Sequence, residues 1–201
     1  MKYLLLGSIL ACYLLASPTL MAQPNSISLK AGDPVPDVRL KTVAGETVSL
    51  RKLVSEKPTV LIFYRGGWCP YCTRHLQALA GIEKDLLAAG YQLLAISPDQ
   101  PSKLREKPEL QKLTYTLLSD SPMDAAKGFG IAFELDAATR EKYQGFGIDL
   151  EAASGQLHHM LPHPAVFIVD TKGVIRFAYV NKDYKVRLEP VKILEAARSS
   201  L

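Results

Sequence analysis

The sequence predicts an α/β fold with a central mixed β-sheet flanked by helices. Residues 59–64 (TVLIFY) and 91–97 (YQLLAIS) are apolar, β-branched and aromatic runs, typical of strands that are buried on both faces. A helical pattern separates them, which predicts a parallel β-α-β unit. Residues 165–170 (AVFIVD) and 174–180 (VIRFAYV) flank a Thr-Lys-Gly turn, which predicts an antiparallel hairpin. Both strand directions are therefore expected in one sheet.

The first 22 residues are typical of a secretory signal peptide, with one lysine followed by an apolar run that has no acidic residue. We expect cleavage after Ala22, which would also remove Cys12. The run is long enough for an uncleaved membrane anchor to be the alternative. Residues 23–30 would then be a linker and residues 31–201 one domain. We therefore expect an exported, periplasmic protein, or one that is anchored in the membrane and faces the periplasm.

The charge pattern excludes one class of partner. The chain has 24 Lys+Arg and 20 Asp+Glu, and its basic residues form no long block. Nucleic-acid binding therefore has no basis in the sequence.

The remaining elements are expected in chain order around this framework. A hairpin turns at Ala44-Gly45, and the helix that begins at Pro70 carries Cys72, Leu76, Leu79 and Leu86 on one buried stripe. Further expectations are a helix end at Gly90, a polar helix from Ser97-Pro98 to about Lys112, a strand at 114–120, a short helix in PMDAAKGFGI, a helix-rich insertion at 132–161 that could cover a site, and a last helix at about 189–198.

Cys69 and Cys72 lie where the first buried strand passes into a helix, at the carboxyl edge of the sheet where chemistry is common. Pro70 suits the first helical turn because it has no N–H to leave unpaired. Unpaired N–H groups and the helix dipole are expected to lower the pKa of Cys69 from about 8.5 to about 4–7. Cys69 would be an exposed thiolate and Cys72 its protected partner. Because so small a disulfide loop stabilises a fold little, a redox pair is favoured over a structural disulfide.

A metal-binding site is the alternative to a redox role for the two cysteines. Two thiolates and a histidine could bind Cu(I) in a chaperone, but a lone CxxC lacks the second ligand pair of a typical zinc site. We expect no cofactor and no bound metal, with His75 an exposed helical residue. The candidate ligands are Cys69, Cys72 and His75, joined by His158, His159 or His163.

Four stretches carry a resemblance to a known family. They are AGDPVPDVRL, VLIFYRGGWCPYC, LLAISPD and HPAVFIVDTKGVIRFAYV. The chain resembles, over about residues 30–200, the thioredoxin-like fold and specifically the peroxiredoxin-like members of the AhpC/TSA (alkyl hydroperoxide reductase/thiol-specific antioxidant) family. The resemblance implies an oxidoreductase with a redox-active centre and an antioxidant role.

The site departs from the P-x-x-x-T-x-x-C loop of peroxiredoxins. Arg65 stands at the proline, Cys69 at the threonine and Cys72 at the peroxide-reactive cysteine, while the family's distant arginine falls at Pro164. One reading implied by the resemblance is a thiol peroxidase in which Cys72 forms the sulfenic acid and Cys69 resolves it. Arg65 could then replace the missing peroxide-binding groups, with surface solvation as its alternative role.

At the positions where it differs from peroxiredoxins, the site resembles that of thioredoxins, which have a CxxC motif and a cis-proline facing it. Pro164 after His163 matches that proline by position, with a trans-proline at a strand start as the alternative. The resemblance implies that a cis-proline here leaves its backbone free to pair with a partner chain beside the cysteines. Trp68, Tyr71 and His163 are the candidate substrate contacts. The main prediction is therefore thiol–disulfide exchange in which Cys69 attacks and Cys72 resolves. The expected partner is a thiol or disulfide protein or a small thiol, with peroxide as a possible substrate.

Overall fold

The computed structural model describes residues 28–200. The expected signal peptide at 1–22 and most of the expected linker at 23–30 lie outside the described residues. Within 28–200, no helix has the length and apolar character needed to cross a membrane.

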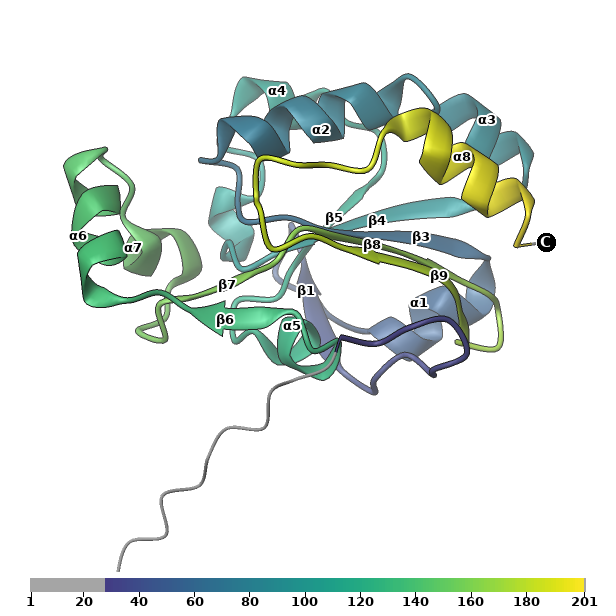
Figure 1. The fold of residues 1–201 in the computed structure, drawn as a ribbon, viewed down its shortest axis with the longest axis horizontal. Helices are drawn as coiled ribbons and strands as arrows, with labels where there is room; N and C mark the ends of the chain where they lie inside the picture. The colour runs from purple at the N-terminus through teal and green to yellow at the C-terminus, as the bar shows by residue number, and fades with distance from the viewer. Residues whose placement is uncertain (1–27, 201) are drawn as a thin grey trace, which may run out of the picture.

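A seven-stranded mixed sheet forms the centre of the molecule (Figure 1). Its strand order is β2-β1-β5-β4-β3-β8-β9. The pairs β3–β4 and β4–β5 are parallel, whereas β3–β8, β8–β9, β1–β5 and β1–β2 are antiparallel, which confirms the predicted mixed sheet. The strands are β1 (Arg39–Thr42), β2 (Thr47–Ser49), β3 (Thr59–Phe63), β4 (Gln92–Ser97), β5 (Thr116–Ser119), β8 (Ala165–Val169) and β9 (Ile175–Val180).

Helices cover both faces of this sheet. In Figure 1, α2, α3, α4 and α8 lie on one face, and α1 and α5 lie on the other. The helices of these two layers are α1 (Leu50–Glu56), α2 (Pro70–Ala80), α3 (Glu83–Ala88), α4 (Pro108–Gln111), α5 (Asp124–Gly128) and α8 (Pro190–Arg198), with a 3-10 turn at Pro101–Lys103.

The central strand β3 divides its side chains between two cores. Val60 and Ile62 belong to the cluster under α2, whereas Leu61 and Phe63 belong to the cluster on the opposite face. Successive strand residues point to opposite faces, so a strand covered on both sides must be apolar throughout. Burial of all five residues of β3 explains the unbroken apolar run and fixes the point at which the next loop leaves the sheet.

Two helical predictions need correction. The helix expected to run from Pro70 to Gly90 is two helices, because it ends at Ala80 and restarts at Glu83 after Gly81 and Ile82. The polar helix expected up to Lys112 is only the 3-10 turn and the short α4. Each of these two begins on a proline, which has no N–H to continue a preceding helix.

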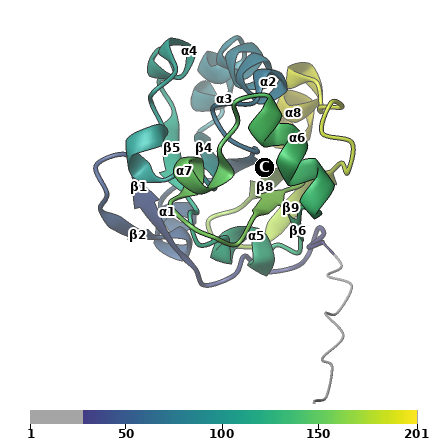
Figure 2. The ribbon, with the colours of Figure 1, turned by 90° about the vertical axis from the view of Figure 1, so that its left-hand side faces the viewer.

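The insertion forms a separate layer at one end of the sheet (Figures 1 and 2). Strands β6 (Ala132–Glu134) and β7 (Met160–Pro162) pair with each other and carry α6 (Ala137–Gly145) and α7 (Leu150–Ser154) between them. Asp136 and Asp149 cap the two helices through their carboxylates. The N–H of Gln100 donates to the carbonyl of Ala153 at 2.8 Å, which ties α7 to the loop after β4.

The prediction of a cis-proline at Pro164 is wrong, because no peptide bond of residues 28–200 is cis. The backbone around it is already paired within the chain. The N–H of His163 donates to the carbonyl of Ile131 at 2.8 Å, and the carbonyl of Pro164 accepts from the N–H of Asn181 at 3.1 Å. Pro164 therefore extends the β8–β9 ladder in the trans form, and its carbonyl is not free to pair with a partner chain.

Candidate active site

Both cysteines lie at the start of α2, directly after the loop that leaves β3. Cys69 is the N-cap and Pro70 the first helical residue. The carbonyl of Cys69 accepts hydrogen bonds from the N–H groups of Cys72 at 3.0 Å and Thr73 at 3.1 Å. Both thiols are free and not bonded to each other. The prediction that Cys69 is exposed is wrong, since 2% of Cys69 and 1% of Cys72 is accessible.

The two thiols titrate as an interacting pair. The hydrogen bond from the Cys72 thiol lowers the pKa of Cys69 from 9.0 to about 6, helped by the nearby charges of Arg65 and Arg187 and opposed by burial. Burial raises the pKa of Cys72, and its hydrogen bond to Cys69 raises it further. In the resting pair the negative charge therefore lies on Cys69 and the proton on Cys72.

Two nitrogen donors converge on the sulfur of Cys72. The backbone N–H of Arg65 lies 3.4 Å from Cys72 Sγ, and the guanidinium Nη2 of Arg187 lies 3.4 Å from the same atom. Arg187 comes from the loop between β9 and α8 and was missed by the sequence analysis. No spacing pattern marks it, because more than a hundred residues separate it from the motif it serves. The family pattern places an arginine at the position of Pro164. In this structure the arginine beside Cys72 comes instead from the loop after β9.

Arg65 is a buried cation among aromatic rings. Its guanidinium carbon lies 4.1 Å from the ring centre of Tyr184, 5.4 Å from Trp68 and 5.5 Å from Tyr143. Its Nη2 donates to the hydroxyl of Tyr143, and its buried Nε has no partner among the described residues. The ion pairs of residues 28–200 do not include Arg65, so surface solvation is wrong for this side chain. Such a cation favours negative charge on the neighbouring sulfurs.

The insertion contributes to the site through Tyr143 on α6. Its ring centre lies 5.8 Å from that of Trp68, and its hydroxyl accepts from Arg65. Figure 2 shows α6 and α7 in front of the sheet. The helix-rich segment therefore covers the end of the molecule where the cysteines lie.

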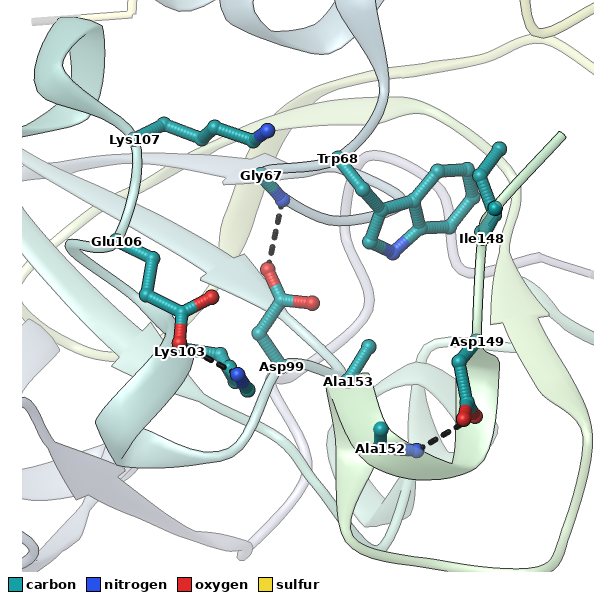
Figure 3. A pocket seen from close by; sticks show the side chains of 11 residues that line it. Gly67, Trp68, Asp99, Lys103, Glu106, Lys107, Ile148, Asp149, Ala152 and Ala153 are labelled. Carbon is teal, nitrogen blue, oxygen red and sulfur yellow. Dashed lines mark hydrogen bonds and ion pairs between the residues drawn. The ribbon is translucent and has the colours of Figure 1, made fainter.

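A pocket of about 220 Å³ opens beside Trp68 (Figure 3). Asp99 lies in its wall, with Oδ2 accepting from the N–H of Gly67 at 2.7 Å and from Ser97 Oγ at 3.2 Å. Burial raises the pKa of Asp99 from 3.8 to about 7, against the effect of these hydrogen bonds. Asp99 was not among the expected site residues, although an acidic residue two positions after the end of a buried strand is a usable signal. The other lining residues are Lys103, Glu106, Lys107, Gly147, Ile148, Asp149, Ala152 and Ala153.

Asp99 makes the stability of the protein depend on pH. Because its pKa is higher in the folded than in the unfolded chain, the folded state binds more protons between pH 4 and pH 7, and stability falls as pH rises. Between pH 5 and pH 8 we expect the wild type to lose about 2–3 kcal/mol more unfolding free energy than Asp99→Asn. Urea denaturation across this range measures the difference. Burial also raises the pKa of Asp120 to about 7. Because Asp120 is present in both proteins, it contributes equally to both stability curves. Parallel curves would contradict the expectation.

Gly66 allows the loop to pass close to Trp68 and Asp99. Its φ is +141°, and a Cβ at this position would lie 2.3 Å from Trp68 Nε1 and 2.8 Å from Asp99 Oδ1. We expect Gly66→Ala to lower the unfolding free energy by about 2–4 kcal/mol, through backbone strain and overpacking together. Gly45→Ala is the matched control, with a φ of +86° and nothing within 4 Å of the added Cβ. It should cost about 1 kcal/mol. Equal losses in urea denaturation would contradict the close approach.

The predicted substrate contacts lie around the pair, at different distances from it. Trp68 is half-buried between the pocket and Arg65. Tyr71 packs edge-on against Tyr184 with ring centres 5.7 Å apart. His163 stacks on Phe133 at 4.4 Å, and burial lowers its pKa. Trp68 and Tyr71 therefore border the cysteine loop, whereas His163 packs against the insertion.

Three of the four histidines considered for a copper site have hydrogen-bond partners of their own. His75 is buried rather than exposed as expected, and its Nε2 lies 3.1 Å from the carbonyl of Leu188. His158 contacts the carbonyl of Ser121, and His159 contacts Arg140 and Glu151. Across residues 28–200, no three His, Cys, Asp or Glu side chains are grouped to hold a metal ion. The copper alternative therefore has no ligand set in the described part of the chain.

Comparison with known proteins places this site in a family. The model of the AhpC/TSA family matches residues 31–178, which is most of the chain. The chain belongs to the AhpC/TSA family. It is thus a peroxiredoxin-type oxidoreductase with a thioredoxin-like fold, which confirms the family, the fold and the enzyme class expected from the sequence.

Relatives of this AhpC/TSA protein are peroxiredoxins. A chloroplastic peroxiredoxin Q of Populus jackii is 29% identical over 170 residues, covering 84% of this chain and 69% of the relative. Peroxiredoxin Bcp of Escherichia coli K12 is 35% identical over 103 residues, covering 51% of this chain and 65% of the relative. The crystal structure of peroxidoxin BcpB from Mycobacterium tuberculosis superposes with a TM-score of 0.66 at 24% identity, covering 85% of this chain and 97% of that chain.

Proposed function

We propose that the protein is a thiol-dependent peroxidase in which Cys72 reacts with the peroxide and Cys69 resolves the product. The observation that carries this assignment is the convergence of the Arg65 N–H and Arg187 Nη2 on Cys72 Sγ. Two donors aimed at one sulfur can hold a thiolate and the oxygen that develops charge beside it. Peroxide and a thiol reductant are accordingly the proposed reactants, and an exported, periplasmic location remains our proposal for where they meet.

The negative charge on Cys69 in the resting pair allows this residue to act first as a base. Cys69 thiolate takes the proton of Cys72, which leaves a thiolate on Cys72 that the two donors stabilise. The Cys72 thiolate attacks the terminal oxygen of the hydroperoxide, the O–O bond breaks, and the leaving alkoxide takes from Cys69 the proton that Cys69 had received, which gives the alcohol and restores the Cys69 thiolate. Cys72 is now a sulfenic acid, oxidised by two electrons.

The second step uses the neighbouring thiol. The Cys69 thiolate attacks the sulfur of the sulfenic acid, the S–O bond breaks as the disulfide forms, and the hydroxide that leaves takes a proton from solvent to become water. Two reductant thiols then reduce the disulfide and are themselves joined as a disulfide. One peroxide and two thiols thus give one alcohol, one water and one disulfide.

Thiol–disulfide exchange that begins at Cys69 is the second candidate. The lowered pKa of Cys69 favours it, because the thiolate is the attacking species in such exchange. The two candidates share the disulfide intermediate and differ in whether peroxide forms it.

The test is stoichiometric oxidation of the reduced full chain. One equivalent of hydrogen peroxide or of cumene hydroperoxide is added, and intact mass and peptide mapping follow the cysteines. The peroxidase proposal expects a Cys69–Cys72 disulfide within seconds and continued peroxide consumption when dithiothreitol is present. A protein that stays reduced under peroxide but is oxidised by a disulfide such as oxidised glutathione would overturn it in favour of exchange.

A further inference from the structure

His75 connects α2 to the loop that carries Arg187. His75 lies one turn after Cys72 on α2, and its Nε2 is 3.1 Å from the carbonyl oxygen of Leu188. Leu188 directly follows Arg187, and its side chain packs against the core under α2. The histidine therefore contacts the peptide next to the arginine that reaches Cys72.

The Leu188 carbonyl fixes the direction of this contact, and burial of His75 decides the charge of its ring. Burial lowers the pKa of His75 from 6.5 to about 4, with the charge of Arg187 adding to the effect. The ring is therefore neutral at neutral pH. Because a carbonyl oxygen only accepts, Nε2 must carry the proton and donate to Leu188. His75 is thus a fixed donor rather than a charge or a metal ligand.

The Arg187 loop packs on the site through Tyr184, which lies against Tyr71 and Arg65, but it has few hydrogen bonds to α2. Arg187 Nη1 bonds carbonyls of its own loop, those of Tyr184 and Val186, so these contacts shape the loop but do not hold it to α2. Val186 is exposed, and α8 begins only at Pro190. Among the described hydrogen bonds, His75 to Leu188 and Arg187 to Cys72 are the two that join this loop to α2.

We propose that His75 is a positioning residue, which anchors the Leu188 carbonyl so that Arg187 Nη2 stays at Cys72 Sγ. The inference deepens the proposed function, because it concerns the arginine beside the sulfur that we assign to peroxide. It also gives a task to the histidine of the C-x-x-C-x-x-H pattern. Without the anchor, the loop can move away from α2 and Cys72 loses one of its two donors.

A double-mutant cycle on the thiol tests this coupling. In a Cys69→Ser background, alkylation of Cys72 by iodoacetamide is followed from pH 5 to pH 10 for four proteins: the background alone, His75→Phe, Arg187→Gln and the double variant. Phenylalanine fills the ring volume without a donor. We expect His75→Phe and Arg187→Gln each to slow alkylation at neutral pH about tenfold, the effect of one hydrogen bond to a charged group, and the double variant to be no slower than Arg187→Gln alone.

Two further variants separate positioning from general stability. Tyr115→Phe removes another buried bond to the backbone of α2, from the Tyr115 hydroxyl to the carbonyl of Leu76 at 2.7 Å, and should leave the alkylation profile unchanged. His75→Gln retains an N–H donor and should restore part of the rate. If His75→Phe does not fold, His75→Leu takes its place in the cycle.

The outcomes that overturn the proposal are an unchanged profile in the His75 variant, additive losses in the double variant, or an equal loss in Tyr115→Phe. Alkylation needs no peroxide, so the result stands apart from the peroxidase test. A coupled cycle with no peroxide reactivity would overturn the proposed function alone. Additive losses with full peroxide reactivity would overturn the positioning role alone.

Discussion

Cys72→Ser is expected to lower peroxide consumption by at least about 1,000-fold, because it removes the sulfur that both donors contact. Serine at this position has nearly the same shape but is not ionised at neutral pH and is a poor nucleophile toward peroxide. The measurement is the rate of peroxide loss with dithiothreitol as the reductant. Circular dichroism and the urea midpoint check that the variant is folded.

Cys69→Ser is the matched control for this change. It should still form a sulfenic acid at Cys72, which dimedone traps in a single turnover, but it cannot close the intramolecular disulfide. It also lacks the thiolate that takes the proton of Cys72, so the reaction should be slower at neutral pH and recover as pH rises. The reverse pattern, with a sulfenic acid on Cys69 in Cys72→Ser and none in Cys69→Ser, would show that the roles of the two sulfurs are exchanged.

Arg187→Gln is expected to lower the second-order rate constant for peroxide about 100-fold, a loss typical of removing one donor that stabilises developing negative charge. Arg187→Lys retains the charge but not the planar fork and should recover only part of the rate. Stopped-flow measurement of the single oxidation step at Cys72 gives the rate constant directly.

Arg176→Gln is the control for loss of a positive charge. Arg176 pairs with Asp170 on the exposed surface, and none of its described contacts involves a cysteine. Its removal should leave the oxidation rate within about twofold of the wild type, since exposed ion pairs contribute little. Equal losses in the two variants would show that net charge, rather than the contact with Cys72, sets the rate.

The framework of the fold could be predicted because it rests on local patterns. The apolar runs at 59–64 and 165–170 are buried strands, and the cysteines lie at the strand-to-helix turn as expected. The ends of helices that are interrupted by a glycine or a proline were harder to predict. Gly81 and Ile82 divide the helix after the cysteines, and the prolines at 101 and 108 limit the next segment to single turns.

The surroundings of the thiols could not be predicted, because they come from segments far along the chain. Arg187 and Tyr184 reach the cysteines from the loop before α8, and Tyr143 reaches Arg65 from the insertion. No periodicity or spacing connects these positions with residue 69. Cys69 and His75 were wrongly expected to be exposed for the same reason. The side chains that bury them come from segments that are distant in the sequence, so the local sequence does not reveal their burial.

The buried guanidinium of Arg65 has a consequence for the reduction potential of the pair. In the reduced protein a thiolate compensates this cation, which has no carboxylate partner among the described residues. Forming the Cys69–Cys72 disulfide removes that negative charge and leaves the cation uncompensated in a site from which water is largely excluded. The protein environment thus favours the dithiol over the disulfide. This raises the reduction potential of the cysteine pair, so that the disulfide is readily reduced. Weak thiol reductants are then sufficient to return it to the state that meets the next peroxide.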